Sequence, residues 1–230
     1  MEERPEVIER VSTPRGELQL QRRGEAYEVI SNGCFLMATY NGLSERAMID
    51  LALQWHPAIH RVLVGGLGVG YTLRAALDAP GVEGVTVVEI EPKVAEWNRG
   101  VLAPCNGHAL SDPRTELILD DLAHYLEGEP HPYDLIALDT DNGPDWTVFE
   151  GNAGLWSPAG LDRLERWLAP RGVLAFWSAN PAPAFEDLLR HRYPQVGVYR
   201  VRAALSTIDD VIYLARLEAH GDAGASGALL

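Results

Sequence analysis

The sequence predicts an α/β fold, in which a doubly wound and mostly parallel sheet of the Rossmann-like type follows a small N-terminal β-hairpin region. From residue 61 onward, short apolar segments alternate with segments of helical spacing, which is the pattern of parallel strands joined by helices. Glycines follow the first apolar segment and acidic residues end or follow the next three, as is typical of the ligand-binding edge of such a sheet. The 230 residues suffice for one large α/β domain with a small appendage.

Three regions divide the chain. Residues 1–55 are expected to form an N-terminal β-strand region with a linking helix, and residues 56–218 the α/β domain. Residues 219–230 are rich in Gly and Ala, and we expect this tail to be disordered.

The elements follow from apolar spacing and turn residues. Residues 15–40 predict two or three short antiparallel strands, with tight turns at Arg23-Gly24 and Asn32-Gly33, and the next segment has helical spacing. The last strand of the chain is expected to run antiparallel. The expected strands of the large sheet are 61–65, 85–89, 115–119, 134–139, 172–178, 196–201 and 211–217. The expected helices are 70–78, 92–102, 121–127, 158–168 and 182–192.

The charge of the chain excludes two classes of partner. Its formal net charge is -14, so a nucleic acid or an anionic membrane surface would repel it. The same field suits a small-molecule acceptor that is cationic or neutral. The chain starts with a charged segment and no apolar run reaches the length of a membrane span, which indicates a cytoplasmic protein. Cys34 and Cys105 lack metal-binding spacing, so no metal site is expected from them.

The first expected strand ends in a glycine-rich turn that leads into a helix. Gly66, Gly68 and Gly70 form a G-x-G-x-G pattern, in which missing side chains let a ligand approach the backbone and the helix N-terminus. A dinucleotide site requires glycine at the sixth position of the pattern, where Tyr71 stands. The spacing therefore favours a site of the S-adenosylmethionine type, with NAD as a weaker alternative. A glycine-rich turn without a ligand is the remaining alternative.

Acidic residues end the next two strands. Glu89 lies nineteen residues after Gly70, where a carboxylate that accepts hydrogen bonds from ribose hydroxyls is expected. Glu91 is its competitor, but we expect Glu91 to be a solvated carboxylate at a helix start. Asp120 and Asp121 follow the third strand, where Asp121 could accept a hydrogen bond from an adenine amino group. A helix N-cap is the alternative role for either aspartate.

The fourth strand leads into Asp139, Asp141 and Asn142 at the same edge of the sheet. A carboxylate here could orient an amine nucleophile or take a proton from it. An Asp-Asn-Gly turn without a catalytic role and a divalent metal held by these oxygens are the alternatives. Trp177, in the following strand, is expected to pack in the core or in a lid rather than to contact a substrate.

The sequence resembles the spermidine synthase (polyamine aminopropyltransferase) family in the order and spacing of four stretches. These are RVLVGGLGVGYTLRAALDAPGVEGVTVVEIEPKV, DPRTELILDDLAHYL, YDLIALDTDNGP and LWSPAGLDRLERWLAPRGVLAFWSAN. The resemblance covers residues 61–217 and implies a methyltransferase-type Rossmann-like fold and a homodimer formed through the N-terminal strands. It implies Asp139 as the first catalytic aspartate. The residues that it implies for the nucleoside are Gly66, Gly68, Gly70, Glu89, Asp120 and Asp121.

The sequence also departs from the family. Its glycine loop has Val69 where the family has an aspartate that faces the amino end of decarboxylated S-adenosylmethionine, and Tyr71 replaces the last glycine. The family's second catalytic aspartate becomes Asn142 or is displaced to Asp141, and its Y-H-E element has no counterpart. Intact S-adenosylmethionine carries its own carboxylate, which an aspartate at position 69 would repel.

These observations together predict a small-molecule transferase that depends on S-adenosylmethionine. Because of Val69, methyl transfer is preferred over aminopropyl transfer from decarboxylated S-adenosylmethionine to a polyamine, which remains the alternative. Asp139 and Asp141 are the expected catalytic residues. A non-catalytic homologue that binds a nucleoside is the further alternative.

Overall fold

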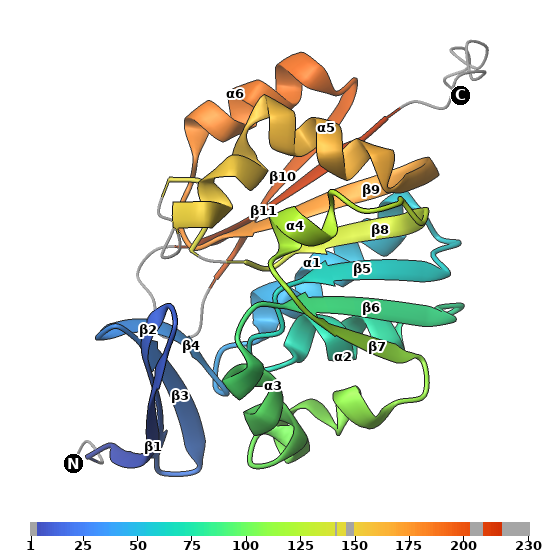
Figure 1. Ribbon diagram of the computed structural model, residues 1–230. Coiled ribbons are helices and arrows are strands. Elements are labelled where there is room, and N and C mark those ends of the chain that lie inside the picture. The colour runs from blue at the N-terminus through green and yellow to red at the C-terminus, as the bar shows by residue number, and fades with distance from the viewer. Residues whose placement is uncertain (1–3, 141, 146–149, 203–208, 218–230) are drawn as a thin grey trace.

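A computed structural model describes residues 4–140, 142–145, 150–202 and 209–217. They form two sheets, of which the smaller one lies at one end of the larger α/β domain (Figure 1). The α/β class and the mostly parallel large sheet confirm the fold that the sequence predicts. The expected tail, residues 219–230, lies outside the described residues, and the domain boundaries stay a prediction.

The N-terminal sheet has four antiparallel strands in the order β1-β2-β3-β4. Their bounds are β1 Glu6–Thr13, β2 Gly16–Arg23, β3 Ala26–Ser31 and β4 Cys34–Ala38. The last three strands and both tight turns lie where the glycines predict them, with Asn32 and Gly33 in left-handed conformation. Residues 15–40 thus hold three strands, within the expected two or three, whereas β1, which precedes this range and is mostly exposed, was not expected. An exposed strand shows little alternation of apolar and polar residues, so the sequence pattern does not predict it.

The large sheet has seven strands in the order β10-β11-β9-β8-β5-β6-β7. Only β11 among these strands runs against the others, pairing antiparallel with both β9 and β10, as the sequence predicts. The bounds are β5 Arg61–Gly65, β6 Gly84–Glu89, β7 Thr115–Leu119, β8 Tyr133–Leu138, β9 Leu168–Ser178, β10 Gln195–Val201 and β11 Asp210–Arg216. The carboxyl ends of the parallel strands therefore meet at one edge, which the first residue of β11 joins.

Helices cover both faces of this sheet (Figure 1). Successive side chains of each strand point to opposite faces, so Val62 and Val64 pack with α1 to α3, whereas Leu63 packs with α4 to α6. The helix predicted over 92–102 ends earlier and is followed by a short 3-10 turn. No helix in the described ranges is long and apolar enough to cross a membrane. The bounds are α1 Leu43–Trp55, α2 Tyr71–Asp78, α3 Pro92–Arg99, α4 Leu122–Tyr125, α5 Pro158–Arg166 and α6 Pro183–Arg192.

Polar contacts fix the N-terminal sheet against the start of α3. The Arg15 guanidinium donates to Glu91 Oε1 over 2.7 Å, and Glu9 accepts from Lys93 and from the Trp97 indole at 3.0 and 2.7 Å. Apolar residues of β2 and β3 also join the core cluster that contains the glycine loop. The small sheet is therefore packed onto the large domain as one wall beside that loop.

Two buried asparagines hold the loop between β5 and α2. Asn98 Nδ2 donates to the Gly68 carbonyl at 2.8 Å, and Asn106 Nδ2 donates to the Val69 carbonyl at 3.1 Å. Asn106 also donates to Asn98 Oδ1 at 2.7 Å and accepts from the Ala109 N–H at 3.1 Å. Both loop carbonyls are thus satisfied from α3 and the turn that follows it.

We expect Asn106→Ala to lower the free energy of unfolding by about 2 to 3 kcal/mol, because it leaves buried polar groups without partners. Chemical denaturation followed by circular dichroism measures this loss. Gln195→Ala, at an exposed position, is the control and should change stability by less than about 0.5 kcal/mol. Equal stability of the two variants would contradict the structural role given to Asn106.

Candidate functional site

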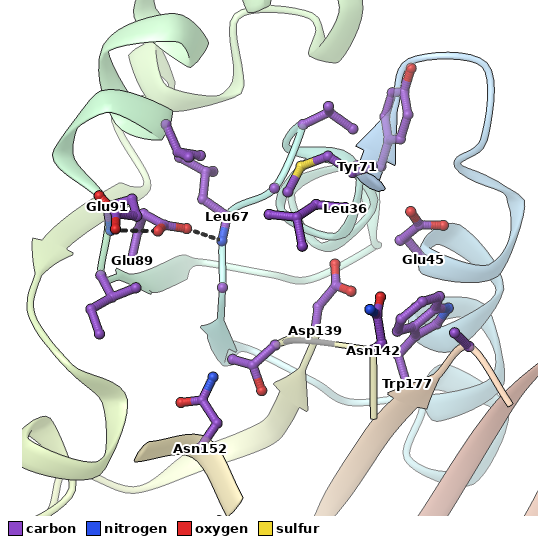
Figure 2. A pocket seen from close by; sticks show the side chains of 18 of the residues that line it. Leu36, Glu45, Leu67, Tyr71, Glu89, Glu91, Asp139, Asn142, Asn152 and Trp177 are labelled. Atoms are coloured by element: carbon purple, nitrogen blue, oxygen red, sulfur yellow. Dashed lines mark hydrogen bonds between the residues drawn. The ribbon is translucent and has the colours of Figure 1, made fainter. Parts of the chain in front are cut away.

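A cavity of about 570 Å³ opens at the carboxyl edge of the large sheet. The glycine loop, the ends of β6, β8 and β9, the start of β11, and α1 contribute to its lining, and β4 of the small sheet closes it from the other side. Figure 2 shows Leu67, Glu89 and Glu91 at one end and Glu45, Asn142 and Trp177 at the other, with Asp139 between them. The cavity therefore lies at the carboxyl edge of the large sheet, where the sequence predicts that a ligand binds.

The glycine loop approaches the backbone of the neighbouring strand too closely for side chains. Gly66 has a φ of 87°, and a Cβ there would lie 2.4 Å from the Asp139 carbonyl oxygen. Gly70 has a φ of 85° and caps the N-terminus of α2. Both positions thus require glycine for the fold itself. Gly66 and Gly68 line the cavity, while Gly70 lies behind them.

Glu89 lies at the cavity wall and ties the loop to the end of β6. Its Oε2 accepts from the Leu67 N–H at 2.9 Å and its Oε1 from the Glu91 N–H at 2.7 Å, as Figure 2 shows. Burial raises the pKa of this carboxyl above its usual range, against the effect of these N–H groups. Sequence spacing predicted a ligand-facing acid here and did not reveal its structural contacts.

Glu91 is not the solvated carboxylate that the sequence suggested. It begins α3, but it is buried and pairs with Arg15 of the small sheet. The partner is 76 positions away in the sequence, so local spacing carries no signal for the pair.

The two aspartates after β7 have different surroundings. Asp121 is the N-cap of α4, accepts from the Ala123 N–H at 2.7 Å, and does not line the cavity. Asp120 lines the cavity and pairs with His124 Nδ1 at 2.8 Å. The capping role that the sequence left open for either residue thus belongs to Asp121, and its contact with adenine stays a prediction.

Asp139 lies at the centre of the cavity, where β8 ends. It accepts a hydrogen bond from Thr72 Oγ1 at 2.7 Å, and burial, assisted by the charge of Asp210, raises its pKa to about 6. Asn142 is buried in the same wall, and its Nδ2 has no hydrogen-bond partner in the described structure. Asp141 lies outside the described residues.

Glu45 and Asp210 also line the cavity, and the sequence analysis missed both. Ser44 Oγ lies 2.7 Å from Asp210 Oδ2 and 2.9 Å from Glu45 Oε2, and it accepts from the indole N–H of Trp177 at 3.0 Å. Trp177, expected in the core or in a lid, packs against the core and also lines the cavity. The signal for Asp210 was available, since the first residue of an antiparallel last strand must lie where the parallel strands end.

The charge of the lining is of one sign. Among the described lining residues there is no Lys, Arg or His. Burial and the neighbouring charge of Asp139 raise the pKa of Glu45 to about 8, and burial raises that of Asp210. Such a cavity favours a cation and disfavours an anion. Six acidic residues line it, namely Glu45, Glu89, Glu91, Asp120, Asp139 and Asp210.

Comparisons with known proteins agree with this fold. A model of the spermine/spermidine synthase domain matches residues 43–183, more than half of the chain. Polyamine aminopropyltransferase 2 of Pseudomonas aeruginosa is 30% identical over 169 residues, which is 69% of this chain and 46% of that protein. A spermidine synthase crystallised with the transition state analogue AdoDATO aligns with a TM-score of 0.78 and 19% identity over 91% of this chain and 73% of that one. Spermidine synthase from Thermotoga maritima aligns with a TM-score of 0.73 and 18% identity over 91% of this chain and 72% of that one.

The preference for methyl transfer was wrong. The curated relatives that the chain matches are polyamine aminopropyltransferases. The preference rested on Val69, which is buried against the core and also lines the cavity. Glu45 and Asp210 bring carboxylates to the cavity from other elements, so the missing loop aspartate does not leave it without negative charge.

The extent of the match differs between this chain and its relatives. The chain spans less than half the length of the curated relative from Pseudomonas aeruginosa, whereas the family model covers most of the large domain. On the matched residues and the shared fold, the chain belongs to the spermine/spermidine synthase family.

Proposed function

We propose that the chain is an aminopropyltransferase, which moves the aminopropyl group of decarboxylated S-adenosylmethionine to an amine acceptor. The observation that carries this proposal is the lining of the cavity, in which acidic residues meet no basic residue of the described chain. Both the donor, with its sulfonium and ammonium groups, and a protonated polyamine are cations. The negative potential of the acidic lining would repel a carboxylate on the substrate and weaken its binding.

The residues at the loop end of the cavity fit a nucleoside. Gly66 and Gly68 expose backbone without side chains, and each oxygen of Glu89 keeps acceptor capacity after its one N–H contact. We assign the ribose to Glu89, while Gly70 shapes the loop and starts the helix. Asp120, at the wall, and Asp121, beside it, are the residues proposed for the adenine end. When bound, the donor supplies a propyl carbon that the sulfonium already activates.

Asp139 is the proposed catalytic residue. Its carboxylate lies at the centre of the cavity, and the Thr72 hydroxyl fixes one of its oxygens. It can orient an amine and take the proton that the nitrogen loses as it forms its new bond to carbon. Asp141, the second proposed catalytic residue, lies outside the described residues. The proposed catalytic role therefore rests on the position and contacts of Asp139.

We expect decarboxylated S-adenosylmethionine to bind at least about tenfold more tightly than intact S-adenosylmethionine, because the carboxylate of the intact form meets several buried carboxylates. Calorimetric titration at one salt concentration measures both affinities. Methylthioadenosine, which has neither an ammonium nor a carboxylate, is the control for the nucleoside end. Equal affinity for the two sulfonium compounds would contradict this prediction.

We expect Asp139→Asn to lower the rate of aminopropyl transfer by about 10² to 10⁴-fold, the usual range for a lost general base. Methylthioadenosine should still bind to the variant. In the wild type, transfer should rise with pH through about 6, where Asp139 loses its proton. Steady-state rates from pH 5 to 8 measure both effects, and a variant as active as the wild type would remove Asp139 from the chemistry.

We also expect a homodimer formed through the N-terminal sheet. Its edge strand β1 exposes Val7 and Ile8 to 49% and 44%, and such an edge pairs readily with a second copy. Light scattering at micromolar concentration should give about twice the chain mass of 25.2 kDa. Ile8→Glu should shift the mass toward the monomer, and a wild-type chain that is already monomeric would contradict the prediction.

A further inference from the structure

One cation of the small sheet contacts the cavity wall beside the glycine loop. Glu91 lines the cavity and is 3% exposed, and the guanidinium of Arg15, in the turn between β1 and β2, donates to its Oε1 at 2.7 Å. Thr13 Oγ1 donates to the same oxygen at 3.1 Å. In the described part of the chain, Arg15 is the only basic residue that pairs with Glu91. Arg15 does not itself line the cavity, so it can act on a ligand there only through the residues that it holds.

The turn that carries Arg15 is held in place by the next hairpin turn of the small sheet. Asn32 Nδ2 donates to the Arg15 carbonyl at 3.2 Å, and Asn32 Oδ1 accepts from the Glu17 N–H at 2.9 Å. A Cβ at Gly16 would overlap Asn32 Oδ1, so the two turns are in direct contact. Thr13 Oγ1 also accepts from the Arg15 N–H at 3.1 Å. The backbone that carries the guanidinium is therefore fixed within the small sheet.

Glu91 connects this guanidinium to Glu89, the carboxylate that we assign to the ribose. The Glu91 N–H donates to Glu89 Oε1 at 2.7 Å, and Figure 2 shows the two glutamates side by side at this end of the cavity. The Arg15 guanidinium also donates to the carbonyl of Ile90, which lies between them in the chain. Its contacts thus hold both the backbone and a side chain of the segment that leads from β6 into α3. The N–H that orients Glu89 belongs to this segment.

The charge of Arg15 matters as well, because the segment carries two buried carboxylates. A buried charge is costly unless it is paired, and two carboxylates that share a site disfavour each other's ionised form. Glu91 Oε2 is buried and has no hydrogen-bond partner among the described residues, so the compensation for this charge lies at Oε1, where Arg15 pairs with it. Without Arg15, the segment that presents its N–H to Glu89 would lose both this compensation and its restraint.

We propose that Arg15 is a positioning residue for the nucleoside, which holds Ile90 and Glu91 so that Glu89 presents its free acceptor sites to the ribose hydroxyls. The small sheet thus takes part in nucleoside binding through a charged contact, and not only through the apolar side chains of β2 and β4 that line the cavity. The inference rests on the proposed function for the assignment of the ribose to Glu89. The binding that it describes requires neither an aminopropyl group nor an acceptor.

The test compares methylthioadenosine with its 2′,3′-dideoxy analogue, which lacks both ribose hydroxyls, by calorimetric titration of the full chain. We expect Arg15→Met to weaken binding of methylthioadenosine about tenfold and that of the dideoxy analogue less than about twofold, because only the first ligand uses the acceptor sites of Glu89. Glu89→Gln should show the same difference between the ligands.

Two further variants separate the charge and the geometry of Arg15 from general effects on the small sheet. Arg15→Lys keeps the charge but cannot make both contacts at once, and it should weaken binding of methylthioadenosine less than about fivefold. Arg22→Met removes an ion pair with Glu6 that lies within the small sheet. It is the matched control and should bind both ligands like the wild type.

The failure of each idea gives a different result. A general loss of structure would weaken both ligands alike, so equal losses in Arg15→Met would overturn the inference, as would unchanged affinity for methylthioadenosine. If Glu89→Gln binds both ligands like the wild type, the ribose does not contact Glu89, and the inference fails even where the wild type transfers aminopropyl groups. A selective loss in Arg15→Met, together with no transfer by the wild type, would support the inference and remove the proposed reaction.

Discussion

The carboxylate of Glu89 links the glycine loop to the end of β6 through hydrogen bonds. The shape of the cavity depends on these hydrogen bonds. One of its oxygens holds the loop through Leu67, and the other holds the start of α3 through Glu91. Asn98 and Asn106 hold the same loop from its opposite side through its carbonyls. The loop is therefore fixed on both sides by buried hydrogen bonds, and it needs no ligand to take its shape.

Burial strengthens the electrostatic interactions of polar groups in the cavity, and it also makes the ionised form of each carboxyl less favourable. Three carboxylates that share the far end of the cavity repel one another when all are ionised, and their raised pKa values record that repulsion and their loss of water. The folded state would have a lower free energy if neutral side chains replaced these three carboxylates. A cation, as the proposed function requires, would offset this unfavourable energy on binding, and such a trade of stability for function is common in proteins.

The sequence predicts the large sheet closely, because its strands are buried on both faces and its helices have apolar spacing. It also predicts the edge where Gly66, Glu89, Asp120 and Asp139 meet, since the carboxyl ends of parallel strands share one edge. It does not predict the contact between Arg15 and Glu91, or the approach of Glu45 to Asp139, because each depends on how distant elements pack. The preference for methyl transfer, which was drawn from Val69, failed for the same reason. The charge of a cavity depends on all the elements that line it, and the glycine loop is only one of them.

The reversed direction of β11 has a consequence for how this family can change. Asp210 lies opposite Val201 of β10, and the next residue, Val211, lies opposite Ser178 of β9, so neighbouring strands hold its backbone. Asp139, in contrast, leads directly into a loop that contacts the glycine turn. A substitution at position 210 can thus alter the charge of the cavity lining while the path of the chain around the glycine loop stays the same. The charge at this end of the cavity can therefore change through a single position at the start of a strand, while the glycine loop on the opposite side keeps its contacts.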